Sequence, residues 1–331
     1  MARLDESHGD ARSLPPAARS VSEHGAERSP EELPREPDAS SPADLSRRVD
    51  AVVVNYNARD ELLACVGSLR ADGAADVTVV DNGSVDGSAA SLAAADPEAR
   101  LVETGANLGY GAGVNRGLAQ GHRELVLVCN ADVAVRPGTL AALTGALDAD
   151  PGLALVGPKL LNPDGTLYPS ARTFPSLVDA IGHGFLGLVA PRNRFTRSYK
   201  MMDWDHVGRR SVDWVSGSCF LARRRALEDL GGFDASYFMY LEDVDLCWRL
   251  GRAGWGVAYE PSGCVLHVQG VSTDQHPYRM ILAHHESLLR FAWRTTTGWR
   301  RLLLPVVAVG LAVRVVGASA QRAAGRPPAS R

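Results

Sequence analysis

Residues 51–82 read AVVVNYNARDELLACVGSLRADGAADVTVVDN and decide the fold of this 331-residue chain. The run AVVVNY (51–56) is short, apolar and rich in β-branched residues, which is typical of a buried strand in a parallel sheet. A helical stretch follows at 59–71, and VTVV (77–80) is a second strand. Two such strands joined by a helix form the repeating unit of an open parallel sheet.

The same alternation continues along the first half of the chain. The sequence predicts helices at 86–95, at 112–120 and after Pro137, and strands at 100–103, 124–129 and 153–157. Pro137 suits the first position of a helix, because the missing N–H needs no partner there. Connections of this length are made as right-handed crossovers. We therefore predict an α/β fold with a doubly wound, mostly parallel sheet flanked by helices.

Composition places the chain among globular proteins. Apolar residues make up 45% of it, and the net charge of −3 gives no argument for nucleic-acid binding. The five cysteines lack CxxC spacing, so we interpret them as reduced thiols of a cytoplasmic protein. We expect no signal peptide, because the polar N-terminus has no apolar core region. Residues 1–48 contain almost no large apolar side chains and are predicted to be disordered.

Acidic residues follow several predicted strands. Asp81 in VVDNGSVDGS and Asp132 in CNADV come after apolar runs, where an open α/β sheet exposes its ligand-binding edge. Each also suits a turn or a helix cap, so neither motif alone settles its role. Glu242 and Asp243 begin the helical pattern EDVDLCWRL, and His267 follows another strand-like run. Carboxylate oxygens with one imidazole suit a divalent metal and a phosphorylated ligand.

The segment GANLGYGAGVNRG (105–117) resembles a dinucleotide-binding loop only superficially. It follows the third strand rather than the first, and no acidic strand end lies about 20 residues later. A nicotinamide-dependent oxidoreductase is therefore disfavoured. Glycines such as Gly109 would let the backbone approach a ligand, and Asn107 and Asn115 offer amide hydrogen bonds. Packing of this loop against the sheet is the competing interpretation.

The alternation of strands and helices stops after about residue 160. Residues 162–212 hold many Pro, Gly, Arg and aromatic residues, and loops of this length inside a domain are usually functional. From Ser287 to the end there are eight arginines and no acidic residue. The most apolar stretch, Leu302 to Val313, is 12 residues long, whereas roughly 20 are needed to cross a bilayer. We expect either a helix in the membrane interface or one packed on the domain with a solvated basic face.

Seven motifs, taken in order, resemble the family 2 inverting glycosyltransferases, which have a GT-A fold. They are VVVNYN (52–57), VVDNGSVDGS, GANLGYGAGVNRG, CNADV, WVSGSCFLARR (214–224), GGFDASYFMYLEDVDLCWRLGRAGW (231–255) and VLHVQG (265–270). The resemblance covers roughly residues 50–270. NPDGTLYPSARTFPSL (162–177), APRNRFTRSY (190–199) and VDWVSGSC (212–219) are most similar to actinobacterial rhamnosyltransferases. Those enzymes transfer L-rhamnose from dTDP-rhamnose to decaprenyl-diphospho-GlcNAc, which builds the linker between peptidoglycan and arabinogalactan.

The resemblance also implies a domain organisation. A GT-A domain would span 49–270, with a nucleotide-binding half at 49–160 and an acceptor-binding half at 161–270. A helical, Arg-rich, membrane-associating region would follow at 271–331. We expect a cytoplasmic enzyme that is peripherally associated with the inner face of the plasma membrane, where a lipid-linked acceptor would lie. A homo-oligomer is possible.

The donor side of the site is carried over position by position from the family's motifs. The expected nucleotide-sugar contacts are Asn57, Asp81, Asn107, Gly109, Asn115 and Asp132. Asp132 would also bind Mg²⁺ or Mn²⁺ at the diphosphate, with His267 as a further ligand. The chain has Asn130-Ala131-Asp132 where the family often has Asp-x-Asp, which puts strict metal dependence in doubt.

The acceptor side follows from the same resemblance. Asp243 would be the general base that deprotonates the acceptor hydroxyl, and Glu242 would position the acceptor or support that base. Trp214 would stack on a sugar face. Asp245, one turn along the helix, is expected to be structural.

Two other functions stay open. One is a different family 2 enzyme, such as a galactofuranosyl-, mannosyl- or glucosyltransferase with a lipid-linked or polysaccharide acceptor. The other is a catalytically inactive nucleotide-binding scaffold. The four residues Asp81, Asp132, Asp243 and His267 together favour an enzyme over the scaffold.

Overall fold

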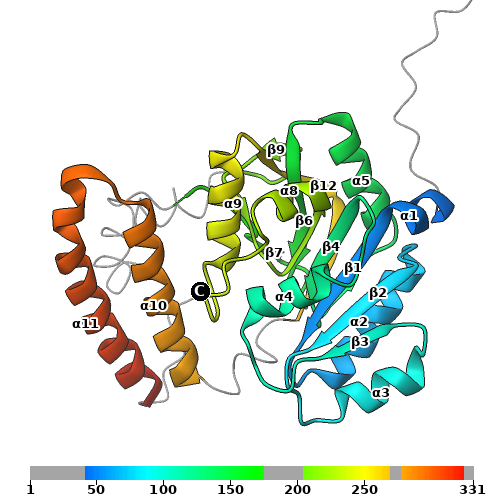
Figure 1. Cartoon of the computed structure of the whole chain (residues 1–331), viewed down its shortest axis with the longest axis horizontal. Helices are drawn as coiled ribbons and strands as arrows, with labels where there is room; N and C mark the ends of the chain where they lie inside the picture. The colour runs from blue at the N-terminus through cyan, green and yellow to red at the C-terminus, as the bar shows by residue number, and fades with distance from the viewer. Residues whose placement is uncertain (1–41, 175–203, 269–276, 324–331) are drawn as a thin grey trace, which may run out of the picture. The chain divides into compact units, whose positions relative to one another are not determined.

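The computed structural model describes residues 42–174, 204–268 and 277–323 (Figure 1). Its first half alternates strands and helices as predicted. These elements are α1 (Pro42–Arg48), β1 (Val49–Asn55), α2 (Arg59–Ala71), β2 (Asp76–Asp81), α3 (Ser88–Ala95), β3 (Arg100–Glu103), α4 (Tyr110–Leu118), β4 (Leu125–Asn130), β5 (Val133–Val135), α5 (Thr139–Ala149) and β6 (Leu153–Leu161). The predictions for α2 and β3 agree to the residue, and the others differ only at their ends. The short strand β5 was not predicted.

Alternate residues of β1 face two separate hydrophobic cores. Ala51 and Val53 pack with residues of α2 and α5. Val52 and Val54 pack with residues of α4 and of a later helix, α9 (Glu242–Arg252). Successive side chains of a strand point to opposite faces of the sheet, so helices cover both faces. All seven residues of β1 are buried, as expected for a central strand of a parallel sheet.

The later elements complete the main sheet and add a small second one. They are β7 (Leu167–Tyr168), β8 (Ala171–Arg172), β9 (Arg210–Ser211), β10 (Trp214–Val215), β11 (Cys219–Arg223), α8 (Arg224–Asp229), α9 (Glu242–Arg252) and β12 (Gly256–His267). The main sheet has the order β3-β2-β1-β4-β11-β6-β12-β5, with β7 paired to β6 and β9 to β12. The second sheet consists of β10 and β8.

The main sheet changes direction at β11. Strands β3, β2, β1 and β4 are parallel neighbours, and β6 pairs in parallel with β12. Strand β11 lies antiparallel between β4 and β6, and β5 is antiparallel to β12. The predicted α/β fold with a mostly parallel sheet is confirmed, but the antiparallel insertion was not predicted. Since β11 lies between β4 and β6, the two predicted halves contribute to one continuous sheet.

The folded region begins earlier than predicted. Residues 42–48, which we placed in the disordered tail, form helix α1, so that part of the prediction is wrong. Leu45 is buried in the core beside β1, and Arg48 pairs with Asp148 at 2.7 Å. One leucine and one arginine therefore hold a segment whose composition alone indicated disorder. The rest of the predicted tail, residues 1–41, lies outside the described residues.

The C-terminal region is helical, as predicted. It consists of α10 (Pro277–Thr295), the 3₁₀ helix η2 (Gly298–Leu303) and α11 (Leu304–Ala323), and α10 and α11 run side by side (Figure 1). The segment Gly298–Ala320 is long and apolar enough to cross a membrane, judged by length and composition alone. Our estimate that this region is too short is therefore wrong, because it counted only the 12-residue run from Leu302 to Val313.

A buried ion pair joins the start of β1 to the end of β11. Asp50 and Arg224 are 5% and 6% exposed, and Nη2 of Arg224 lies 2.6 Å from Oδ2 of Asp50. Arg224 also donates hydrogen bonds to the carbonyl oxygens of Leu118 at 2.9 Å and Arg123 at 2.6 Å. Loss of one partner from such a pair leaves the other charge buried without compensation, which is strongly destabilising.

We predict that Arg224→Met lowers the free energy of unfolding by about 3 kcal/mol, because the carboxylate of Asp50 loses its closer buried cation and keeps Arg123 at 3.3 Å. Arg225→Met is the matched control: its side chain is 86% exposed, and we expect a change within about 0.5 kcal/mol. Urea denaturation followed by tryptophan fluorescence measures both. Equal stability of the two variants would contradict this account of the β1–β11 connection.

Candidate active site

The first part of the site lies where β1 and β2 end. Asn55 and Asp81 are paired in register, and Nδ2 of Asn55 donates to Oδ1 of Asp81 at 3.0 Å. The backbone N–H of Ser84 donates to Oδ2 of Asp81 at 3.2 Å. Asn57, with φ of 51°, accepts a hydrogen bond from the N–H of Val85 at 2.8 Å. These side chains shape the turn after β2, and contact of Asn57 and Asp81 with a nucleoside stays a prediction.

Asn82 ties the glycine-rich loop to this edge. Its Nδ2 donates to the carbonyl oxygen of Gly109 at 3.1 Å, and its Oδ1 accepts the N–H of Leu108 at 3.0 Å. Gly109 has φ of 91°, and a Cβ at this position would overlap the carbonyl group of Phe238. Asn107 accepts the N–H of Gly109 at 3.0 Å. At Gly109 the close approach is therefore to the protein's own backbone, which favours the packing interpretation for this glycine.

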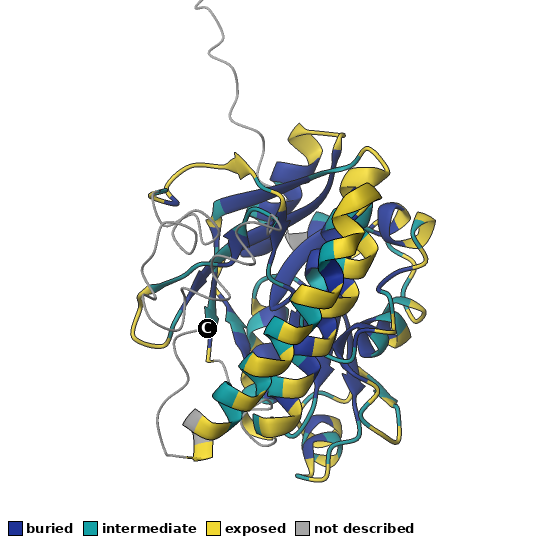
Figure 2. Cartoon of the chain, turned by 90° about the vertical axis from the view of Figure 1, so that its left-hand side faces the viewer, coloured by how far each residue is buried: buried dark blue, intermediate teal, exposed yellow. Residues whose placement is uncertain are grey.

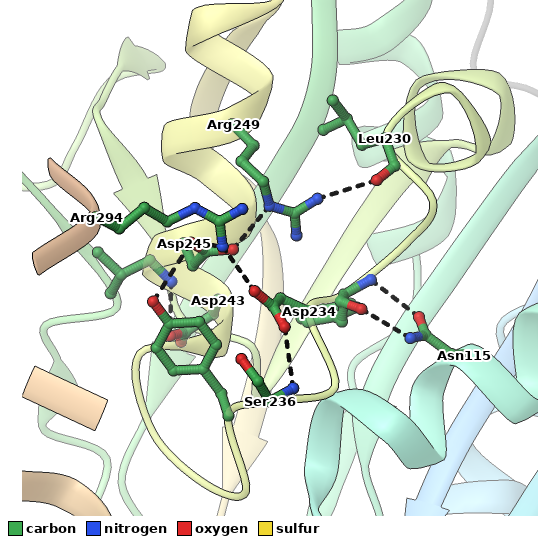
Figure 3. A network of polar contacts seen from close by, with 11 residues as sticks. Asn115, Leu230, Asp234, Ser236, Asp243, Asp245, Arg249 and Arg294 are labelled. Carbon is green, nitrogen blue, oxygen red and sulfur yellow. Dashed lines mark hydrogen bonds and ion pairs between the residues drawn. The ribbon is translucent and has the colours of Figure 1, made fainter. Parts of the chain in front are cut away.

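Asn115 forms a clamp between α4 and the segment that precedes α9. Its Oδ1 accepts the N–H of Phe233 at 2.9 Å, and its Nδ2 donates to the carbonyl oxygen of Phe233 at 2.8 Å (Figure 3). Both polar atoms of the amide are thus engaged within the protein. The predicted contact of Asn115 with the nucleotide sugar has no support from this arrangement and stays a prediction.

Asp132 and His267 are brought together by the antiparallel pairing of β5 with β12. His267 is opposite Val133, and the N–H of Val268 donates to the carbonyl oxygen of Asp132 at 2.9 Å. Nε2 of His267 lies 3.3 Å from Oδ1 of Asp132. The ring of His267 also meets Tyr168 edge-on, with centroids 5.7 Å apart. The sequence prediction that these two residues share one site agrees with this geometry.

These two side chains could hold a divalent cation. Both are buried, and Oδ1 of Asp132 and Nδ1 of His267 have no hydrogen-bond partner. Buried polar atoms without partners are rare, and a carboxylate oxygen with an imidazole is a suitable donor set. Within 42–174, 204–268 and 277–323, no group of three or more His, Cys, Asp or Glu residues could hold a metal ion. Further ligands would have to come from substrate oxygens and water, as is usual for Mg²⁺.

Helix α9 begins with the acidic pair, directly after a strained turn. Tyr240 has φ of 66° and Leu241 has φ of 61°, in the left-handed region that bulky residues rarely adopt. Each such residue costs about 1–3 kcal/mol and persists only where its surroundings hold it. Glu242 and Asp243 follow in the first turn of the helix. Glu242 is 5% exposed, and its Oε2 has no hydrogen-bond partner.

Asp243 is better supplied with hydrogen bonds than Glu242. Its Oδ2 accepts the N–H of Gly217 at 2.8 Å, and its Oδ1 accepts the N–H of Val244 at 2.8 Å. The carbonyl oxygen of Gly217 accepts the buried hydroxyl of Tyr110 at 2.5 Å. The loop between β10 and β11 is therefore fixed on one side by α4 and on the other by α9.

The two carboxyl groups titrate differently. Burial, followed by the charge of Asp243, holds the pKa of Glu242 well above its usual value. Burial also raises the pKa of Asp243, but the N–H groups of Gly217 and Val244 and the charge of Arg172 oppose that rise. Neighbouring carboxyl groups with different environments have their pKa values pushed apart. The structure thus favours an ionised Asp243 beside a protonated Glu242.

Backbone hydrogen bonds connect these groups at one edge of the sheet. The N–H of Asn82 donates to the carbonyl oxygen of Asn55 at 2.8 Å, and the N–H of Asn130 donates to that of Ser218 at 3.0 Å. Ser218 follows Gly217, which holds Asp243, and Asn130 is two residues before Asp132. The Asp132–His267 pair and the acidic pair therefore flank a single turn.

A family model described as "Glycosyltransferase like family 2" matches residues 47–280, which is most of the chain. The chain belongs to the family 2 glycosyltransferases. The resemblance noted in its motifs is thereby confirmed for the family as a whole.

Relatives and solved structures agree with that assignment. N-acetylglucosaminyl-diphospho-decaprenol L-rhamnosyltransferase of Mycobacterium tuberculosis is 43% identical over 245 residues, which cover 71% of this chain and 80% of that enzyme. Rhamnosyltransferase WbbL of Escherichia coli is 39% identical over 98 residues, which cover 30% of this chain and 34% of WbbL. The structure of mannosyltransferase PcManGT from Pyrobaculum calidifontis, in complex with GDP-Man and Mn²⁺, has a TM-score of 0.53 at 19% identity; the match covers 91% of this chain and 81% of PcManGT. It confirms the GT-A-like fold.

Trp214, a predicted acceptor-binding residue of this glycosyltransferase, is buried inside the protein. Trp214 is 6% exposed, and its indole N–H donates to the carbonyl oxygen of Thr173 at 3.0 Å. Arg172 lies over the indole ring, 5.1 Å from its centroid. The pairing of β10 with β8 places the ring in the core, which gives no support to stacking of Trp214 on a sugar, and that contact stays a prediction.

Sequence reasoning missed several residues that build this glycosyltransferase site. Asn55, Asn82, Ser84, Tyr110, Arg172 and Gly217 hold or face the predicted groups. All six stand inside quoted motifs, so their positions offered a signal but their partners did not. Arg172 was the hardest to assign, since it acts from a two-residue strand. Asp245 was correctly predicted to be structural: it is fully buried and pairs with Arg249 at 2.7 Å.

Proposed function

We propose that this glycosyltransferase transfers L-rhamnose from dTDP-rhamnose to polyprenyl-diphospho-GlcNAc, with inversion, in cell-wall linker biosynthesis. The observation that carries the proposal is that Asp243 and the Asp132–His267 pair flank one turn at the sheet edge. The 43% identity to the mycobacterial rhamnosyltransferase supports this donor and acceptor.

An inverting transfer needs one base and charge stabilisation on the opposite side. The acceptor hydroxyl oxygen forms a bond to the anomeric carbon while the bond from that carbon to the dTDP phosphate oxygen breaks. Asp243 takes the hydroxyl proton, and dTDP leaves with the bonding electrons. Glu242, which keeps its proton, can donate a hydrogen bond to the acceptor, in agreement with the supporting role predicted for it.

In this proposal, the donor diphosphate binds at Asp132 and His267. When a divalent cation, Mg²⁺ or Mn²⁺, is bound there, it neutralises charge on the leaving diphosphate. The unpartnered Oδ1 of Asp132 and the imidazole of His267 are the residues that would hold it. The nucleoside is placed at the adjacent ends of β1 and β2, beside Asp81.

We predict that Asp243→Asn lowers kcat by about 10²–10⁴-fold while donor affinity stays within about twofold, because only proton removal is lost. Glu242→Gln is the matched control, since an amide resembles the protonated acid that the environment of Glu242 favours. We expect it to lower kcat by less than about tenfold. Transfer from dTDP-rhamnose to synthetic polyprenyl-diphospho-GlcNAc measures kcat, and calorimetry with dTDP measures donor affinity.

A larger loss of kcat in Glu242→Gln than in Asp243→Asn would overturn the assignment of Asp243 as the base. The pH profile tests it independently. Because burial raises the pKa of Asp243, the base loses its charge at a higher pH than an exposed aspartate does. The acidic limb of kcat should therefore lie above the usual aspartate range, with activity falling as the pH drops. Transfer from UDP-sugars but not from dTDP-rhamnose would redirect the donor assignment.

We predict that Asp132→Asn and His267→Gln each weaken Mn²⁺ binding to the dTDP-loaded enzyme by about tenfold or more, since each removes one ligand. Asp164→Asn is the control, because this exposed carboxylate is bonded to Thr166 in its own turn. Water-proton relaxation measures bound Mn²⁺ without any transfer. Unchanged Mn²⁺ affinity in both site variants would exclude this pair as the metal ligands.

We also propose that the C-terminal helices bring the enzyme to the membrane surface that holds its acceptor. Their outward side, which we call the hairpin face, is apolar and exposed (Figure 2). It comprises Tyr278, Leu282, Leu289, Trp293, Trp299, Leu302, Val306, Val309, Val313 and Val316. No acidic residue follows Glu286. An apolar face with exposed tryptophans, and with basic charges alone beyond Glu286, fits the interface of an anionic membrane.

We predict that Val309→Asp weakens binding to vesicles of phosphatidylglycerol and phosphatidylcholine by about tenfold, because a charge then enters the apolar interface. Val207→Asp is the matched control, since Val207 is 74% exposed, close to the 65% of Val309, but lies outside the hairpin. Vesicle sedimentation measures the partition. Equal loss, or no loss, in the two variants would contradict the hairpin face as the membrane-binding surface.

A further inference from the structure

The inner side of helix α10 contacts the strained turn at Tyr240 and Leu241, directly before the acidic pair. The hydroxyl of Ser287 donates to the carbonyl oxygen of Met239 at 3.0 Å. The rings of His284 and Tyr240 meet edge-on with centroids 5.2 Å apart. These contacts act on the residues next to Leu241, whose left-handed backbone needs support from its surroundings.

Arg294, the second-last residue of α10, reaches the first turn of α9. Its Nη1 lies 3.0 Å from Oδ1 of Asp245 and 2.6 Å from Oδ2 of Asp234 (Figure 3). Asp245 is completely buried, and its other oxygen pairs with Arg249 of its own helix at 2.7 Å. Asp245 therefore has two cations: Arg249 from its own helix and Arg294 from α10.

The second contact of Arg294 fixes the segment between α8 and α9. Asp234 also accepts the N–H of Ser236 at 2.9 Å, and the preceding Phe233 is clamped by Asn115 of α4. In Figure 3 Arg294 points between Asp234 and Asp245, with Asn115 on the far side of Asp234. One guanidinium thus joins α10, α9 and a segment that is anchored to α4.

We propose that Arg294 is a positioning residue that aligns Asp243 for proton transfer by pairing with Asp245, two residues further along the first turn of α9. The assignment of Asp243 as the base rests on the proposed function. Removal of Arg294 leaves Asp245 with one cation instead of two and breaks the ion pair between α10 and α9. The strained turn at Tyr240 and Leu241 then loses part of what holds it, and the carboxylate of Asp243 loses its alignment.

Arg294→Gln in the full chain should lower kcat by about ten- to hundredfold, with KM for dTDP-rhamnose within about twofold, because misalignment affects the reacting groups and not the donor. Arg294→Lys should recover part of kcat, since it restores the charge without the planar guanidinium. Arg225→Gln, on the exposed side of α8, is the control and should keep full activity. Vesicle sedimentation should show unchanged binding for all three variants.

A second readout does not depend on the substrate. Amide hydrogen exchange of a peptide spanning 238–245 should speed up in Arg294→Gln and stay normal in Arg225→Gln. Ser287→Ala removes only the bond to Met239 and serves as the mild variant if Arg294→Gln does not fold. It should lower kcat by about two- to fivefold without changing KM.

The outcomes separate the two proposals. Wild-type enzyme that fails to transfer rhamnose, while exchange at 238–245 still responds to Arg294→Gln, would overturn the proposed function and keep the positioning contact. Active enzyme in which Arg294→Gln and Ser287→Ala leave kcat unchanged would overturn the positioning role. A rise in KM with unchanged kcat would also overturn it, because the effect would then be on binding.

Discussion

Pairing of β11 with β4 sets the geometry on which the site depends. In this antiparallel register Cys219 lies opposite Cys129, so the turn that precedes β11 falls beside the residues that follow β4. That turn contains Gly217, whose N–H holds Asp243, and Ser218, whose carbonyl oxygen accepts the N–H of Asn130. A parallel strand in this place would reach the edge from the other direction, and its preceding turn would lie at the opposite end of the sheet.

The site concentrates unfavourable interactions where proton transfer is needed. Glu242 carries an unpartnered buried oxygen, the neighbouring carboxyl groups oppose each other's ionisation, and Tyr240 and Leu241 hold left-handed backbone conformations. Together these features cost several kcal/mol, on the order of the net stability of a domain. The cores on both faces of the sheet and the buried pair of Asp50 with Arg224 offset this cost. The surrounding fold therefore has to be stiff for Asp243 to act as the proposed base.

Local patterns in the sequence predicted what depends on local physics. Apolar runs and helical spacing gave nearly all elements up to β6, and strand ends gave Asp132 and His267, whose pairing follows from β5 and β12. The antiparallel direction of β11 was missed, because it depends on residues far apart in the chain. The burial of Trp214 was missed for the same reason: a tryptophan beside a predicted site suggests stacking, but its pairing strand β8 is only two residues long and has no sequence signal.

The two sides of α10 would couple the proposed membrane attachment to the proposed catalytic base. Ser287 and Arg294 lie on the side that contacts α9 and the strained turn, whereas Leu282 and Trp293 lie on the exposed side. An α-helix repeats every 3.6 residues, so one sequence can serve a polar inner contact and an apolar outer face at once. Binding of the outer face to a lipid surface would also restrain the inner face, because the helix is a single rigid element. The proposed membrane surface and the proposed base are then connected through one helix, which suits an enzyme whose acceptor is a lipid-linked sugar.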